Sequence, residues 1–129
     1  MSMQAQVLEA LRNLIDARGG NAPVTVGPMP PENGISILPA AGRVTQTTLA
    51  GGETVTLEVA LNARNASQAA ALEALCAFHE ALARLDELPA GTGWQMTAIH
   101  SSALPAYVEQ EEGQWLYGSA LMVEYSTQG

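Results

Sequence analysis

Residues 67–88 read SQAAALEALCAFHEALARLDEL, and this stretch decides the fold. Ser67 is a good N-cap residue, and the alanines that follow it favour a helix with little bulk. Large apolar residues recur at spacings of three and four, which places them on one side of that helix. Such a helix needs a broad apolar surface to cover, and the segments around it that alternate with period two would supply one as a β-sheet. The predicted apolar stripe consists of Leu72, Leu75, Cys76, His79, Leu82 and Leu85.

The chain before this helix predicts one further helix and two short strands. Met3 to Arg18 has helical periodicity and is followed by two glycines and a proline, which end it. Val24–Val26 alternates as a short strand, and the prolines of residues 27–31 make that stretch a loop or an edge, because proline lacks the N–H of a ladder. A second short strand, Ile35–Ile37, is expected to end at Pro39.

A β-hairpin is predicted just before the long helix. Its first arm, Arg43 to Leu49, is rich in threonine and valine, and it turns at Gly51-Gly52 into the alternating arm Thr54–Leu61. The first arm is polar on both faces. It therefore either projects from the body as an arm for a neighbour or lies as a solvated edge strand.

A second hairpin is predicted after the long helix. A strand from Trp94 to His100 and a bend or bulge at residues 101–105 lead into two arms that meet at a Glu-Glu-Gly turn, residues 111–113. The last strand, Trp115–Tyr125, is apolar on much of both faces, so we expect it at the centre of the sheet. The predicted fold class is α+β: a mostly antiparallel sheet with two helices packed on one face and a projecting hairpin, in one domain over residues 1–129.

Composition excludes several classes of protein. Thirteen acidic residues face five arginines and no lysine, which gives a net charge of −8 and argues against binding nucleic acid through phosphate neutralisation. There is no long apolar run for a transmembrane helix and no signal-peptide pattern. The single Cys76 permits no internal disulfide, fits a reducing compartment, and is interpreted as a small buried hydrophobe.

No catalytic pattern emerges. His79 lies on the apolar stripe and His100 ends a strand, so each is interpreted as a structural histidine. Metal-ligand spacings are absent, the paired glycines lack the lysine of a phosphate loop, and Ser101 and Ser102 lack an evident base. We therefore expect no catalytic residues, no cofactor, no metal site and no enzymatic activity.

The chain nevertheless resembles a family. Val26-Gly27-Pro28-Met29-Pro30-Pro31, then Asn33-Gly34-Ile35-Ser36-Ile37, and then Val55 to Asn65 leading into the long helix, resemble the bacteriophage minor capsid proteins grouped with tail terminators. Pro105-Ala106-Tyr107-Val108, an acidic glycine turn and Trp115 to Tyr125 look like that family's closing hairpin. The likeness covers nearly the whole chain, and residues 38–52 are longer than its pattern.

The resemblance implies structural work in a virion. Tail terminators form a ring, typically of six copies, on the last ring of the tail tube, where they stop polymerisation and present the surface to which the head connector docks. The implied partners are other copies of the chain, the tail tube protein and a head–tail connector protein. Double-stranded DNA would pass through the channel without specific binding. The protein would be assembled in the host cytoplasm, reside in the tail or neck, and meet no membrane.

Two sets of residues are candidates for this work. For the channel wall they are Glu109, Glu111 and Glu112, whose charge would repel phosphates. The candidates for the assembly interface are Arg43, Val44, Thr47, Leu49, Glu53 and Glu58.

Two other functions are alternatives. Another neck component, such as a head-closure or tail-completion protein, would share the same features. A small ligand-binding or hydrolytic domain, with a pocket holding His100 and Tyr107 or a nearby carboxylate, is a further alternative.

Overall fold

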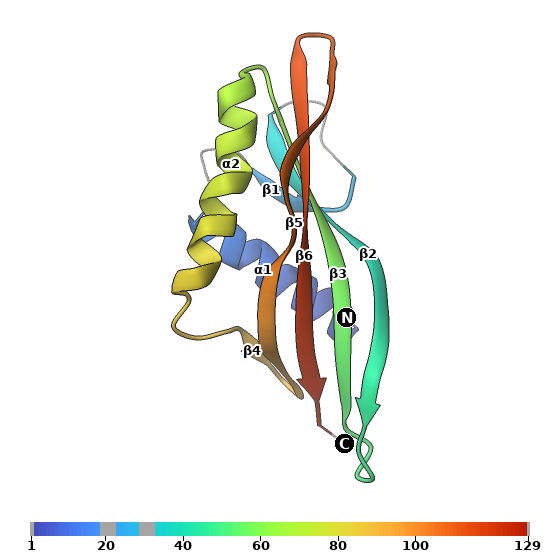
Figure 1. Ribbon diagram of the computed structural model, residues 1–129. Helices are drawn as coiled ribbons and strands as arrows, with labels where there is room; N and C mark the ends of the chain where they lie inside the picture. Colours follow the sequence, from blue (N-terminus) through green and yellow to red (C-terminus); the bar gives the residue numbers. More distant parts are fainter. Residues whose placement is uncertain (1, 19–22, 29–32, 129) are drawn as a thin grey trace.

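The computed structural model describes residues 2–18, 23–28 and 33–128, and it confirms the predicted α+β class. The described strands form one sheet in the order β1-β2-β3-β6-β5-β4, in which β1 and β2 are parallel and every other pair is antiparallel. Both helices lie on one face of that sheet (Figure 1). The elements are α1 (Met3–Arg18), β1 (Val24–Val26), β2 (Gly34–Thr47), β3 (Glu53–Asn65), α2 (Gln68–Ala81), the 3₁₀ turn η1 (Leu82–Arg84), β4 (Ala90–Gly91), β5 (Trp94–Glu111) and β6 (Gln114–Thr127).

The long helix begins as predicted and ends early. The Ala70 backbone N–H donates to Ser67 Oγ at 3.3 Å, so Ser67 is the N-cap. The α-helix stops at Ala81 and tightens into η1, and Leu85 is already extended. Its predicted continuation to Leu88 is wrong because the chain has to turn back toward β4, and no glycine in the sequence marks that stop.

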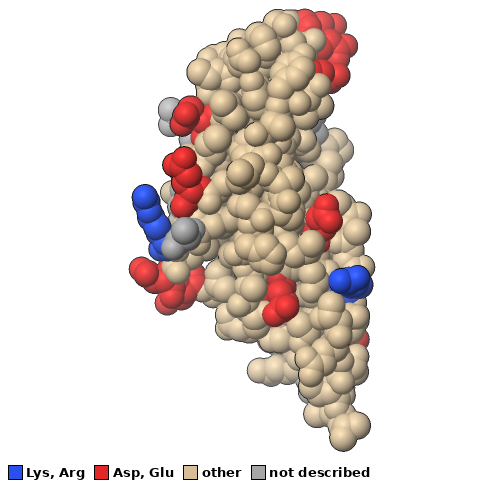
Figure 2. Space-filling view, viewed as in Figure 1, with Lys and Arg blue, Asp and Glu red and all other residues tan. Residues whose placement is uncertain are grey.

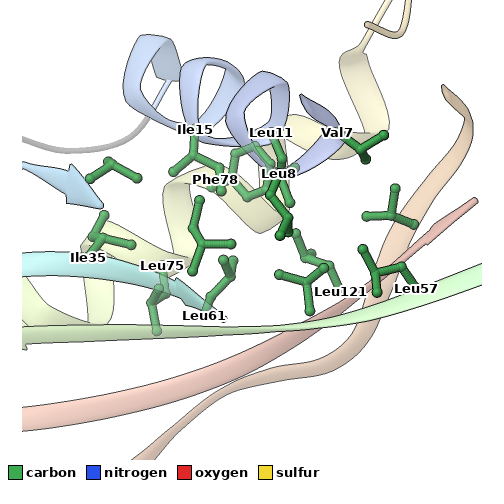
Figure 3. Packing of buried hydrophobic residues seen from close by; sticks show 14 of the residues in the cluster. Val7, Leu8, Leu11, Ile15, Ile35, Leu57, Leu61, Leu75, Phe78 and Leu121 are labelled. Atoms are coloured by element: carbon green, nitrogen blue, oxygen red, sulfur yellow. The ribbon is translucent and has the colours of Figure 1, made fainter. Parts of the chain in front are cut away.

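The buried face of α2 is rotated from the predicted stripe. Phe78, absent from that stripe, is almost fully buried, whereas Leu72, Cys76 and Leu82 are only half-buried. Figure 3 shows Phe78 beside residues of α1, which supplies the second apolar surface that the helix covers. The small alanines on this face let α2 lie close to the sheet. The buried residues of α2 are Ala71, Ala74, Leu75, Phe78 and His79.

Strands β3 and β6 form the centre of the sheet, as predicted for Trp115–Tyr125. They pair from Thr54 with Ser126 to Asn65 with Trp115, and buried and half-buried positions alternate over Leu57–Ala63 of β3 and Tyr117–Tyr125 of β6. The prediction that β6 is buried on much of both faces is wrong. Its second face is half-exposed because both helices cover the same side of the sheet. We call this second side the uncovered face.

Strand β2 does not end at Pro39, contrary to the sequence prediction. It runs on to Thr47, with Pro39 paired to Val59 of β3. The Ile35 N–H donates to the Pro23 carbonyl and the Ile37 carbonyl accepts from Gly27, so these residues bond toward the β1 side. Pro39, two residues further, faces the same outer edge, where a missing N–H breaks no ladder bond.

Strand β5 is also longer than predicted. It is continuous from Trp94 to Glu111, so His100 lies inside a strand and does not end one. Register shifts at Ser101/Ala103 and Ala103/Ala106 confirm the predicted irregularity as β-bulges. The β2–β3 and β5–β6 hairpins project at opposite ends of the sheet (Figure 1).

Truncation of Leu75 should measure how strongly α2 is fixed to the sheet. Leu75 is 1% exposed, so Leu75→Ala should lower the free energy of unfolding by roughly 2–5 kcal/mol in urea denaturation. Leu82→Ala, at a half-buried position, should lower the free energy of unfolding by less. Leu49→Ala, at a fully exposed position, is the matched control and should stay within about 0.5 kcal/mol of wild type. An unchanged Leu75→Ala variant would contradict the packing of α2.

Candidate assembly surfaces

The acidic candidates of the β5–β6 hairpin lie together at its tip. Glu109, Glu111 and Glu112 line one hollow of about 330 Å³, and all three are exposed. Glu112 and Gly113 adopt positive φ angles of 51° and 77°, as a tight hairpin turn requires. Figure 2 shows acidic atoms gathered at this end of the molecule.

Arg64 of β3 lines the same hollow, and sequence reasoning missed it. The ladder pairs Arg64 with Leu116 of β6 and pairs Glu109 with that same leucine, so one basic side chain is placed among three carboxylates. The signal was available only through the strand register, because Arg64 and Glu109 are far apart in the chain. Arg64 offsets part of the negative charge at the tip.

The assembly-interface candidates occupy the β2–β3 hairpin, which is both an edge and a projecting arm. Residues 38–50 are exposed on both faces, and Leu49 at the turn is fully exposed. Arg43 and Glu58 line a second hollow on the uncovered face. Thr47 pairs with Glu53, whose backbone N–H donates to Thr127 Oγ1 at 3.0 Å.

Val44 points to the other side of this arm. It pairs with Val55, which packs against the core from the helix side of the sheet. Val44 is nevertheless 49% exposed. The candidates therefore do not form one patch: the structure distributes them over both faces and the tip of the hairpin.

A third surface was not identified from the sequence. Leu104, Tyr107 and Val108 of β5 are 70%, 55% and 52% exposed. The Tyr107 ring meets Trp115 and Tyr117 edge-on, with ring centroids 6.1 Å apart in both pairs. Interpreting residues 101–105 as a bend hid the fact that these side chains belong to one continuous strand.

His79 joins α2 to the sheet. Its Nδ1 lies 2.7 Å from Ser101 Oγ on β5, and its Nε2 lies 2.8 Å from Ser119 Oγ on β6. Chain folding thus places a histidine beside Ser101, a neighbour that the sequence alone did not indicate. Both ring nitrogens are satisfied, as expected of a structural histidine, and burial lowers the pKa of the His79 imidazole.

Cys76, on the same helix, is half-buried and not fully buried as predicted. Burial raises the pKa of the Cys76 thiol, and the carboxylates of Glu73 and Glu80 raise it further. The thiolate that would be the reactive form is thus disfavoured.

The residues of the alternative hydrolytic site are separated. His100 is exposed on the uncovered face, where it pairs with Met122, whereas Tyr107 lies on the helix side with Tyr117. Neither residue lines the hollows at Glu109 or Arg43. In the described part of the chain, no group of three or more histidine, cysteine or acidic side chains could hold a metal ion. No helix in that part is long and apolar enough to cross a membrane.

Comparison with known proteins gives a likeness of fold. No protein-family model and no curated protein matches the chain. Among solved structures, it is similar to a chain from the virion of a native gene transfer agent (GTA) particle, with 19% sequence identity and a TM-score of 0.57. The likeness covers 99% of this chain and 96% of that one. At this identity it shows that the two chains share a fold over nearly their whole length.

The buried His79 predicts an acid-sensitive contribution to stability. Because its pKa is lowered from 6.5 in the folded chain, the unfolded chain takes up the proton first as pH falls. The contribution is present in full above pH 6.5 and is lost as pH falls from there toward the lowered folded pKa.

The measurement is urea denaturation of wild type and His79→Gln between about pH 7.5 and pH 5. Glutamine can still bond both serines but does not titrate, so the variant should lose less stability over this range. Parallel losses in the two proteins would contradict the assignment to His79.

Proposed function

We propose that this chain is a structural protein of a phage-like virion and acts as a tail terminator. The observation that carries the proposal is the likeness of fold, from end to end, to a chain of a gene transfer agent virion. The sequence resemblance to tail terminators supports it independently. In this role six copies of the chain form a ring that caps the tail tube, stops its polymerisation and receives the head connector.

The geometry supports assembly. The sheet carries a projecting hairpin at each end, and the tips differ in charge: one holds Glu109, Glu111 and Glu112, while residues 47–52 at the other hold no charged side chain. Figure 2 shows the same contrast between the two ends. A molecule with two unlike ends is suited to a position between unlike partners, here the tail tube protein and a head–tail connector protein.

The acidic tip is our candidate for the channel wall. Glu109, Glu111 and Glu112 are exposed, and Arg64 offsets only part of their charge. Carboxylates around a central opening would repel DNA phosphates and let the duplex pass without binding. A ring structure with a neutral or basic bore would contradict this assignment.

Deletion of the gene from the phage or prophage that carries it tests the function. Electron microscopy of the resulting particles should show overlong tails of irregular length, because nothing stops the tube. Normal-length tails lying beside filled heads would instead make the protein a neck component on the head side. Intact, infectious virions would overturn the assembly role.

The β2–β3 hairpin should be needed for attachment and not for folding. Val44→Asp with Leu49→Asp places charges at exposed positions, so the melting temperature should change by less than about 2 °C. The same double variant should no longer bind purified tail tubes in a co-sedimentation assay, because the hairpin contacts either the tube itself or a neighbouring copy in the ring that binds the tube. Glu73→Arg, on the exposed side of α2, is a matched surface control and should still bind. A large drop in melting temperature would make the hairpin part of the core.

A further inference from the structure

We propose that the β2–β3 hairpin of one copy docks along the outer edge of β5 in a second copy that points in the same direction. The inference rests on the proposed ring-forming function, and it names the surface that receives the arm. The arm is defined by Arg43, Val44 and Leu49, and the receiving surface by Leu104, Tyr107, Val108, Glu109 and Glu111.

The exposed apolar side chains of the chain identify these two surfaces as candidate contact sites. Eight large hydrophobic residues are exposed in the described part of the chain, and six of them lie on the arm strand and its turn or on β5. Since exposed apolar side chains that gather in patches mark interaction sites, both surfaces need a cover. On the arm the exposed residues are Leu38, Val44 and Leu49, and on β5 they are Leu104, Tyr107 and Val108.

Along both segments the outer edge of the strand is not paired with another described strand over most of its length. Among the described strands, β1 pairs with β2 only at residues 35–37, and β4 pairs with β5 only at residues 94–95. The Met96 N–H still donates to the Pro89 carbonyl, so residues 38–47 and 97–111 are outer edges of the sheet. Bulges interrupt both, which limits a regular ladder and leaves recognition mainly to side chains.

Charge is complementary between the two surfaces. Arg43 is the one charged residue of β2, whereas the end of β5 carries Glu109 and Glu111. An arginine facing Glu109 and Glu111 would be attracted, and acidic copies that otherwise repel one another would gain a specific contact. In such a contact Glu112 would remain as the channel-wall carboxylate without a partner arginine from the neighbouring copy.

The two surfaces also agree in which face carries the charge. Arg43 pairs with Thr56 and Glu109 pairs with Leu116, and both of these partners lie on the uncovered face. Val44 pairs with Val55 and Tyr107 pairs with Tyr117, on the helix side. A sheet continued from one copy to the next would therefore place Arg43 on the same face as Glu109, and Val44 on the same face as Tyr107.

The order along the strands fixes the relative direction of the copies. Both orders are given from the end of the sheet with the β2–β3 turn toward the end with the β5–β6 turn (Figure 1). In this direction the arm presents Leu49, Val44 and then Arg43. In the same direction β5 presents Leu104, Tyr107 and then Glu109. Copies that point the same way match these orders, whereas copies that point in opposite directions would place Arg43 beside Leu104.

Disulfide cross-linking tests the contact directly. In a Cys76→Ser background, a mixture of the Leu49→Cys and Leu104→Cys proteins should give a linked dimer under oxidising conditions. Neither protein alone should, and Leu49→Cys mixed with Glu73→Cys is the matched control that should not link. Cross-linking of Leu49→Cys with itself would show a tip-to-tip contact and overturn the proposal.

Charge exchange tests the same contact without a thiol. Arg43→Glu, or Glu109→Arg with Glu111→Arg, should weaken self-association by about tenfold in sedimentation experiments, because like charges then face each other. All three changes in one chain should restore it. Glu73→Arg should leave association unchanged, and melting curves should confirm that each variant folds. Equal association in all variants would overturn the proposal.

The outcomes separate this contact from the proposed function. Irregular overlong tails in the gene deletion, together with no cross-link and no charge effect, would keep the tail-terminator role and reject the docking. A protein that stays monomeric up to about 1 mM would also reject it, because even a weak copy-to-copy contact is populated there. Cross-linked copies from a phage whose deletion leaves tails normal would keep the docking and reject the role.

Discussion

The ladder between β3 and β6 is the interaction on which the rest of the structure depends. It joins Thr54–Asn65 to Trp115–Ser126 without a register shift, so every second side chain of both strands points to the same side. The apolar side chains of the two strands thereby form one continuous surface, with Leu57, Val59, Leu61, Leu121 and Val123 almost fully buried. A slip of one residue would move this whole set to the opposite face.

The helices follow from that surface. They cover its central part with residues such as Leu11, Leu75 and Phe78, and His79 adds two hydrogen bonds to serines of β5 and β6. The hairpins extend beyond this cover at both ends (Figure 1). Because strands of this length exceed what two helices can bury, the exposed arms and edges that carry the proposed assembly are a direct consequence of how the core is built.

The long elements and the alternating strands could be predicted, whereas positions set by contacts between distant segments could not. Ser67 marked the start of α2, and the alternation of Thr54–Leu61 marked β3, because both are local signals. Phe78 was missed because α1 supplies a second apolar surface, and Pro39 was misread because a proline is harmless on an outer edge. The segment at Leu104 and Tyr107 was hidden by bulges that only strand pairing reveals.

The sequence by itself determined the α+β class, the two helices, the central last strand and the acidic composition, because periodicity and charge are properties of neighbouring residues. Only the tertiary structure decided that Arg64 lies among the acids of the hairpin tip, that His79 bonds Ser101 and Ser119, and that one face of β6 stays uncovered. The physical reason is that these features depend on strand register and helix placement. Both are fixed by the free energy of burying the whole core and not by any single segment.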